Sequence, residues 1–477
     1  MVTMQVSRHD FLKGLSSVFA LGAFGGGRLF AVPPGWTPPG KPNLVFGVIS
    51  DTHLRTVHGP SGRPGHNWPD KYFAAALTYF RTQNVDAVVH CGDFAHRGQV
   101  EEMQFHAKVW NKIFPKNLAP DGHEVVKLFV TGNHDTEGAA YGDFVKKNYP
   151  DPVVRARHVL QTDMAANWER IWGEKYEPVW HKEVKGYHFF GCNHKVPLET
   201  LVSCLRSNAP ALEESKAHRR PFFYMQHSRP LWNVRKELRH LSRGCSLLSF
   251  FGHNHWSASN WNVISLYRGN VPCIQVPSCE PRGCDGLVAD AWIAKGKLER
   301  LPQTGKGRQG YVVRVYDDML VIARREFGEG GSLGADWAMP FGKGGEHPFS
   351  KEELKKAIGE PQFRQGAELA VKDVAAKGDS PAAVELAIPL ADANPESRVY
   401  AYDVVVAGKE KKEKLFKSVY AAGCNLGMGH EPDGGVTRLA IPVSQLPAGE
   451  TLTFAVRPLS SLGTFGKAIA AAKAVNR

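Results

Sequence analysis

Short apolar runs that end in Asp, Asn or His recur five times between residues 44 and 255. The runs cover residues 44–49, 85–91, 125–131, 222–226 and 247–251. Continuous apolar runs of this length, containing β-branched and aromatic residues, are typical of strands buried on both faces of a largely parallel sheet. The pattern therefore predicts an α/β domain.

Helices are predicted between the first three of these strands. Asp70 is a suitable N-cap for a helix whose apolar face includes Phe73, Leu77 and Phe80. A second helix is expected near residues 100–114. Strand–helix–strand units of this size imply right-handed crossovers and a parallel core.

The polar residues at the ends of the runs form five short motifs. They are Asp51-x-His53, Gly92-Asp93, Gly132-Asn133-His134-Asp135, His227 and Gly252-His253-Asn254-His255. On an extended strand end, Asp51 and His53 would point the same way because they are two residues apart. Any one motif could be an ordinary polar strand end or a satisfied core histidine. Together, at the carboxyl ends of several strands, they favour one site built from distant parts of the chain, suited to divalent cations.

Beyond about residue 360 the pattern changes to short β-rich runs between Gly, Pro and Asp turns. The runs cover residues 384–388, 399–406, 437–443 and 452–456. They predict a small antiparallel sandwich at residues 360–477, without a cluster of candidate ligands. We interpret it as a structural or binding module whose partner the sequence does not identify. Earlier, Lys185-Gly186 and Asp317-Asp318 have the turn chemistry of two β-hairpins.

Residues 1–31 have the order of a signal peptide. Arg8 and Lys13 precede a moderately apolar stretch at residues 15–24, which is followed by Ala31. The segment resembles a twin-arginine export motif, with His9 in place of the second arginine. We therefore expect an exported protein, periplasmic or extracellular; a cytoplasmic tail is the alternative. No other apolar stretch is long enough to cross a bilayer.

Composition narrows the class of ligand only slightly. The chain has 477 residues, 43% of them hydrophobic and 22% charged, as expected for a globular protein with two or three domains. Its formal net charge of +12 favours anionic ligands such as phosphate esters. Part of that charge lies in the lysine-rich stretch at residues 409–417, and no aromatic-plus-basic motif indicates a nucleic-acid partner.

In this order the five motifs resemble those of the calcineurin-like metallophosphoesterase superfamily, over roughly residues 42–345. The resemblance implies two sheets packed as a sandwich with helices outside. The Asp51-x-His53 form is more similar to the branch that contains cyclic-nucleotide phosphodiesterases. Purple acid phosphatases carry Asp-x-Asp there, and a tyrosine where this chain has His96.

The resemblance also implies a site with two divalent transition-metal ions (Mn, Fe, Zn or Co) and a role for each motif. Asp93 would bridge the two ions. One ion would be completed by Asp51, His53 and His255, and the other by Asn133, His227 and His253. Matching histidines in the family face the leaving-group oxygen, which makes His134 the candidate general acid, with Asp135 holding its ring.

The segment from Gly92 to Gly98 is similar to the Gly-Asp-x-x-Asp-Arg-Gly motif of the protein phosphatases. His96 replaces the second Asp, which weakens a protein-phosphatase interpretation. Arg97 is a candidate for binding substrate phosphate, although a plain surface arginine is an equally good interpretation.

The expected activity is therefore hydrolysis of phosphate mono- or diesters, with diesters favoured, by attack of a dimetal-bound hydroxide. The alternative is a binding protein that keeps the phosphoesterase fold only as a scaffold. Such scaffolds usually lose ligands or the acid histidine, and in this sequence none is missing.

Overall fold

A computed structural model describes most of the chain. The described residues are 37–38, 40–54, 68–137, 146–147, 149–241, 243, 245–259, 263–266, 272–280, 308–328, 331–334, 336–341, 355, 359–392, 399–408, 414–421, 424, 436–447, 449–460 and 462–475. The predicted export segment lies outside them. So does almost all of the expected boundary at residues 345–360, and the domain limits stay predictions.

The first of two large sheets carries the first three predicted strands. Its six strands follow the order β12-β11-β10-β1-β2-β3. They are β1 (Leu44–Ile49), β2 (Ala87–His90), β3 (Val126–Phe129), β10 (Gln309–Val315), β11 (Met319–Glu326) and β12 (Trp337–Pro340). β1, β2 and β3 are parallel, whereas β10, β11 and β12 extend the sheet antiparallel. The predicted hairpin around Asp317 and Asp318 joins β10 to β11.

The second sheet carries the other two strands that end in candidate ligands. Its order is β4-β5-β6-β7-β9-β8. The strands are β4 (Val179–Val184), β5 (Tyr187–Cys192), β6 (Phe222–Gln226), β7 (Leu247–Phe251), β8 (Ile264–Leu266) and β9 (Pro272–Gln275). β5, β6, β7 and β9 are parallel. Lys185 and Gly186, at φ 51° and 77°, turn the predicted hairpin between β4 and β5.

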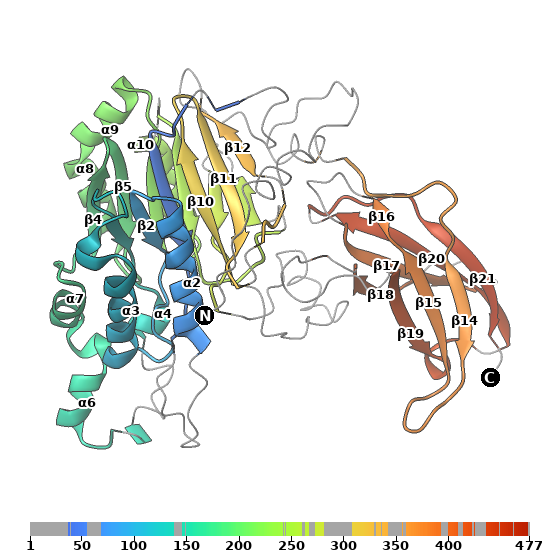
Figure 1. Cartoon of the computed structure of the whole chain (residues 1–477). Helices are drawn as coiled ribbons and strands as arrows, with labels where there is room; N and C mark the ends of the chain where they lie inside the picture. Colours follow the sequence, from blue (N-terminus) through green and yellow to red (C-terminus); the bar gives the residue numbers. More distant parts are fainter. Residues whose placement is uncertain are drawn as a thin grey trace, which may run out of the picture.

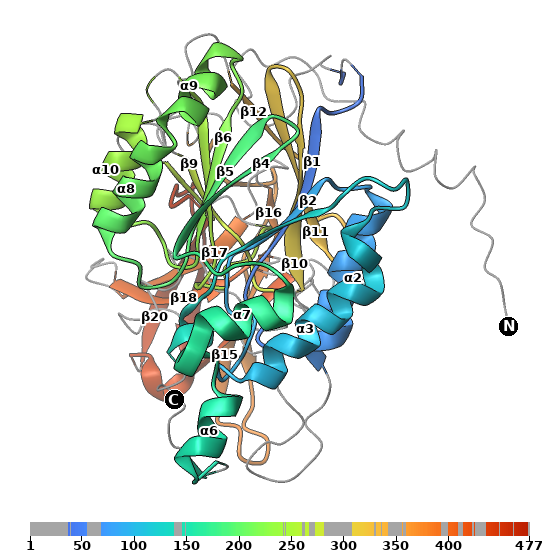
Figure 2. The same cartoon turned by 90° about the vertical axis from the view of Figure 1, so that its left-hand side faces the viewer.

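Helices cover the outer face of each sheet (Figure 2). α2 (Trp68–Thr82), α3 (Val100–Ile113) and α7 (Met164–Trp172) pack against the first sheet. α8 (Leu198–Ser207), α9 (Ala209–Ala217) and α10 (Trp232–Leu241) pack against the second. Two short helices, α4 (Asn133–Thr136) and α6 (Pro152–His158), are also present among the described residues. α2 begins at Trp68, so Asp70 lies inside it and the predicted N-cap was wrong.

The two sheets pack face to face around aromatic side chains. The ring of Phe46 on β1 meets the rings of Phe189, Phe223 and Phe250 edge-on, at centroid distances of 5.4, 5.0 and 6.1 Å. Edge-to-face contacts of this kind add stability beyond the burial of apolar area. This core fixes one sheet against the other, and with it the strand ends of both. The predicted helix–sheet–sheet–helix architecture is confirmed.

The predicted all-β region follows, drawn in orange and red in Figure 1. Its strands form sheets of order β14-β15-β19, β18-β17-β20-β21 and β13-β16. They are β13 (Gln362–Phe363), β14 (Ala370–Val374), β15 (Ala383–Pro389), β16 (Ala391–Asp392), β17 (Val399–Ala407), β18 (Lys414–Tyr420), β19 (Val436–Pro442), β20 (Glu450–Ser460) and β21 (Ile469–Val475). Val384 and Leu386 of β15 share a core with Tyr402 of β17 and Phe454 of β20. The C-terminal part of the fold prediction is thus also confirmed.

None of the helices in the described part of the chain combines the length and the apolar composition that crossing a membrane would require.

Candidate metal centre

All seven predicted ligands meet at one end of the paired sheets. Each follows the carboxyl end of a strand: Asp51 and His53 follow β1, Asp93 follows β2, Asn133 follows β3, His227 follows β6, and His253 and His255 follow β7. Three of these strands belong to the first sheet and two to the second, because the sandwich brings the ends of both sheets together. The edge is therefore shared between two sheets.

One group of ligand atoms consists of Asp51, His53 and His255. Nε2 of His255 lies 3.0 Å from Oδ1 of Asp51 and 3.2 Å from Nε2 of His53. Oδ1 of Asp51 lies 3.7 Å from Nε2 of His53. Atoms bound to one cation at about 2 Å are separated by about 3 Å or slightly more, so this group can hold an ion.

A second group consists of Asn133, His227 and His253. Oδ1 of Asn133 lies 2.9 Å from Nε2 of His227 and 3.0 Å from Nδ1 of His253. Nδ1 of His227 lies 2.8 Å from the carbonyl oxygen of Cys91, which can only accept, so Nδ1 carries the proton. A metal-binding histidine commonly donates its other ring N–H in this way, which leaves Nε2 for the ion.

Asp93 faces both groups. Its Oδ2 lies 3.6 Å from Nε2 of His53 in the first group and 3.1 Å from Nε2 of His227 in the second. A carboxylate between two ligand groups is what a shared, bridging ligand requires.

Several ligands are held in a strained backbone conformation. The left-handed region is occupied by Asp51 (φ 53°), His53 (φ 43°), Asp93 (φ 57°), His253 (φ 74°) and His255 (φ 57°). Each such residue costs on the order of 1–3 kcal/mol, and strain of this kind gathers at functional sites. The expectation that Asp51 and His53 continue an extended strand was wrong, because β1 ends at Ile49. Both side chains reach the site from left-handed turns.

Two glycines of the motifs allow the carboxylates to approach the backbone. A Cβ at Gly132 would lie 2.1 Å from Oδ1 of Asp93. A Cβ at Gly252 would lie 2.5 Å from Oδ2 of Asp51. Real Cβ atoms do not come this close, so both positions need glycine for the carboxylates to sit where they do.

The electrostatics of the site favour a cation. Burial by itself would raise the pKa values of Asp51 and Asp93, but the nearby imidazoles, led by His255 and His227 respectively, hold both well below the usual range. Burial would lower the pKa of His227, yet the charges of Asp93 and Asp51, together with hydrogen bonds to Asp93 and to the Cys91 carbonyl, outweigh burial and raise that pKa to about 10. Two buried carboxylates thus attract positive charge. Oxygen and imidazole donors fit divalent transition metals.

A comparison of the sequence with protein-family models agrees with a metal centre at these residues. Residues 44–257 match the family model of the calcineurin-like phosphoesterases. This part of the chain is a calcineurin-like phosphoesterase domain. All seven candidate ligands lie within the matched residues.

Comparison with solved structures finds distant similarities. A dimetal phosphatase from Danio rerio is 11% identical, with a TM-score of 0.36; the match covers 63% of this chain and 100% of that one. A purple acid phosphatase from yellow lupin (Lupinus luteus) seeds is also 11% identical, with a TM-score of 0.38; 62% of this chain and 53% of that one are covered. Comparison with curated proteins found no match.

Within the phosphoesterase domain, Asp135 does not hold the ring of His134. Nδ1 of His134 lies 2.8 Å from the carbonyl oxygen of His96 and therefore donates to it. Asp135 instead accepts four backbone N–H groups, from Gly132, Asp93, Phe94 and Ala95, at 2.8, 3.0, 3.3 and 2.8 Å. The expectation for Asp135 is corrected accordingly. Its carboxylate fixes the loop that carries Asp93.

His134 itself lies over the first ligand group. Its ring centroid is 4.5 Å from that of His53, and its backbone N–H donates to Oδ1 of Asp93 at 2.8 Å. Burial lowers the pKa of His134, while the charge of Asp93 acts in the opposite direction. The ring of His134 therefore lies beside the ligands but belongs to neither of the two ligand groups.

Arg97 is half-buried in the loop after Asp93, where its backbone N–H donates to Glu102 at 2.9 Å. Its role as a phosphate-binding residue stays a prediction. The sequence interpretation missed its neighbour His96, whose ring centroid lies 5.6 Å from those of His53 and His134. The available signal was its position three residues after Asp93 in the matched motif.

A chain of hydrogen bonds beneath the site was also missed. Gly92 N–H donates to Nδ1 of His90 at 3.2 Å, and Nε2 of His90 lies 3.1 Å from the hydroxyl of Thr52. That hydroxyl lies 2.8 Å from Nε2 of His106, whose Nδ1 lies 3.0 Å from the carbonyl of Glu102. Because Nδ1 of His90 accepts from the Gly92 N–H, His90 is neutral with its proton on Nε2, and the Glu102 carbonyl places a proton on Nδ1 of His106. The chain anchors Thr52 between Asp51 and His53.

Proposed function

We propose that the protein is a metal-dependent phosphoesterase that hydrolyses phosphate esters, with diesters preferred over monoesters. The observation that carries this proposal is the position of Asp93 between two complete ligand groups. One ion would be held by Asp51, His53, His255 and Asp93, and the other by Asn133, His227, His253 and Asp93. Divalent ions bound there would lower the pKa of a bound water and neutralise charge on the phosphate.

His134 is proposed as the general acid. Since Nδ1 is engaged with the His96 carbonyl, Nε2 is the nitrogen that can carry a proton to the leaving oxygen. The contact fixes both the tautomer and the direction of the ring. Burial makes the imidazolium a readier donor because it lowers the pKa of His134.

The preference for diesters rests on the Asp51-x-His53 and Gly132-Asn133-His134-Asp135 motifs, which are similar to those of the diesterase branch. Paired aryl and alkyl substrates, each offered as a mono- and a diester, would measure it. A higher kcat/KM for the monoester of both pairs would contradict the preference and leave the phosphoesterase proposal standing.

Metal removal tests the proposal itself. Protein purified with its metals retained should hold close to two transition-metal ions per chain, measured by elemental analysis. Exhaustive chelation should abolish hydrolysis of an aryl phosphate diester, and adding Mn²⁺, Zn²⁺ or Co²⁺ should restore it. Full activity after chelation would contradict a metal-dependent mechanism.

We also propose that the protein is exported, on the signal-peptide order of residues 1–31. N-terminal sequencing of protein from the native source should find a mature chain that begins near residue 32. An intact N-terminus on cytosolic protein would contradict export.

A further inference from the structure

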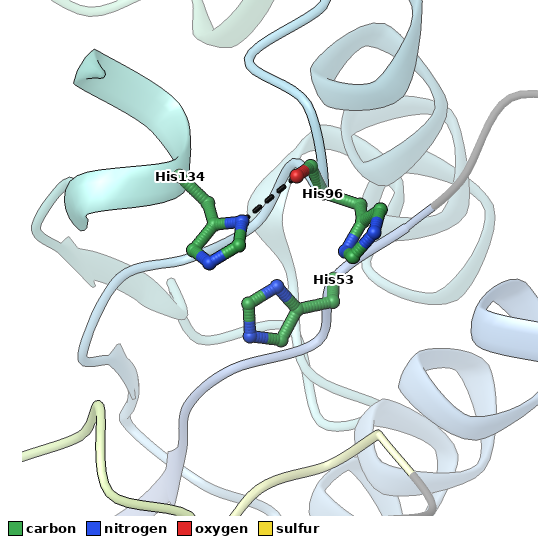
Figure 3. A group of neighbouring side chains, drawn as sticks. All are labelled: His53, His96 and His134. Carbon is green, nitrogen blue, oxygen red and sulfur yellow. Dashed lines mark hydrogen bonds between the residues drawn. The ribbon is translucent and has the colours of Figure 1, made fainter. Parts of the chain in front are cut away.

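A third cluster of imidazoles lies beside the metal centre (Figure 3). It consists of His53, His96 and His134, and one nitrogen from each ring lies within 4.8 Å of the other two. His53 and His96 lie in the loops after β1 and β2, and His134 lies in α4, which follows β3. Neither the metal-centre assignment nor the proposed hydrolysis uses the three together.

His53 belongs to the first ligand group through one ring nitrogen and to this histidine cluster through the other. Nε2 faces the first ligand group, 3.2 Å from Nε2 of His255. Nδ1 is on the other side of the ring. It is buried and has no hydrogen-bond partner among the described residues, and the whole residue is only 1% exposed. A buried ring nitrogen without a partner is destabilising, and a ligand at this point would offset that cost.

The other two rings lie on the side of His53 that bears Nδ1 (Figure 3). His134 meets His53 edge-on at 4.5 Å between centroids, and His96 lies at 5.6 Å from each. The His96 carbonyl fixes a proton on Nδ1 of His134, so Nε2 is the nitrogen of this ring whose lone pair would bind a cation. Three imidazoles without a carboxylate favour Zn²⁺ or Cu²⁺ over Mg²⁺ or Ca²⁺.

We propose that His53 Nδ1, His96 and His134 form a third, exchangeable site for a divalent transition-metal ion such as Zn²⁺. An imidazole shared by two cations is bound as the imidazolate, so occupancy releases the Nδ1 proton of His53 to solvent. The same Nε2 of His134 cannot bind an ion and donate a proton. Excess Zn²⁺ should therefore inhibit hydrolysis by occupying this site, which rests on the proposed role of His134 as the general acid.

The test is a zinc titration of protein already loaded with two ions, followed by equilibrium dialysis. Wild-type protein should take up one more Zn²⁺ than the His96→Gln variant. His218→Gln, which changes an exposed histidine after α9, is the matched control and should behave as wild type. The same excess Zn²⁺ should slow wild-type hydrolysis of an alkyl ester more than that of His96→Gln, each relative to its own rate without added zinc.

Three results would overturn the site: no third ion on wild-type protein at millimolar Zn²⁺, a third ion retained by His96→Gln, or its loss in His218→Gln. If His96→Gln fails to fold, His134→Gln replaces it and should lack the third ion. Binding without inhibition would overturn the competition for His134. A dimetal protein that binds the third ion but hydrolyses no ester would instead contradict the proposed function.

Discussion

Asp93 in the phosphoesterase domain and Asp403 in the C-terminal β region are both almost fully buried, with exposed fractions of 1% and 2%. Asp403 accepts from the Ser418 hydroxyl at 2.7 Å and from the Arg457 guanidinium at 3.0 Å. Arg457 thus supplies a permanent positive charge beside Asp403. The described ion-pair partners of Asp93 are the imidazoles of His53 and His227. An imidazole can give up its proton, so a metal ion can take over the balancing charge.

The phosphoesterase domain and the C-terminal β region also differ in backbone strain. Five candidate ligands have left-handed φ angles, whereas among the described residues from 359 onward only glycines do. Strain of on the order of 1–3 kcal/mol per residue is tolerated where the surrounding structure over-determines it. In this protein the buried carboxylate at the candidate metal centre is itself in a left-handed conformation and is paired with histidines, whereas the buried carboxylate of the β region is paired with an arginine.

Exchanging each carboxylate for an amide gives the largest expected effect. Asp93→Asn should release both ions and lower kcat/KM by about 10³-fold or more, because charge stabilisation by metals supplies several kcal/mol. Asp403→Asn should leave metal content and kcat unchanged but lower the free energy of unfolding by about 1–3 kcal/mol, since Arg457 loses a charged partner. Elemental analysis, kinetics and urea unfolding measure the three quantities. Metal loss in Asp403→Asn would contradict a purely structural role for Asp403.

A smaller effect is expected at the neighbouring residues His134 and Asp135. Their variants distinguish a residue that donates a proton to the leaving group from a residue that supports the loop carrying Asp93. His134→Gln should slow an alkyl ester by about 10²–10⁴-fold, slow a nitrophenyl ester much less, and leave the two ions held around Asp93 in place. An alkoxide leaving group needs a proton, whereas a nitrophenolate hardly does. Measured kcat/KM values for both esters give the answer.

Asp135→Asn is the matched control. It removes charge from the carboxylate that accepts the backbone N–H groups around Asp93, so we expect both esters to lose activity equally, together with metal. An equal loss on both esters in His134→Gln would make that residue a positioning group. Loss of either of the two ions around Asp93 in His134→Gln would make His134 a ligand of that centre.

The strands and the seven ligand positions could be predicted because the hydrophobic runs are short, separate and followed by unusual residues. How those residues reach the site could not. The left-handed turns at Asp51 and His53 depend on partners far along the chain. The backbone N–H groups of Asp51 and His53 donate to the carbonyls of Gly92 and Asp93, and the backbone N–H of His253 donates to the Asp51 carboxylate. The true contacts of Asp135 and the position of His96 depend on the same loops. A pattern along the chain records which elements form, but not the register in which distant loops meet.

The smallest expected effect concerns acid stability. Burial lowers the pKa of His106 to about 4, below its usual 6.5, so the folded protein binds this proton less readily than the unfolded chain. The stabilising contribution is complete above pH 6.5 and is lost as the pH falls toward 4. At 1.36 kcal/mol per unit, the loss reaches about 2 kcal/mol by pH 5. The C-terminal β region contains no histidine among its described residues, so acid should weaken the phosphoesterase domain first.

Intrinsic fluorescence can separate the two regions, because all 11 tryptophans precede residue 338. Urea unfolding of metal-free protein at pH 7 and pH 5, followed by tryptophan emission, should show the expected loss. Metal-free protein is needed because acid also releases ions from their ligands. His106→Gln should be less stable at pH 7, since it disrupts the contact with Thr52, but should lose about 2 kcal/mol less between the two pH values. An unchanged pH dependence in His106→Gln would place the acid-sensitive group elsewhere, with His90, whose pKa burial also lowers, as the next candidate.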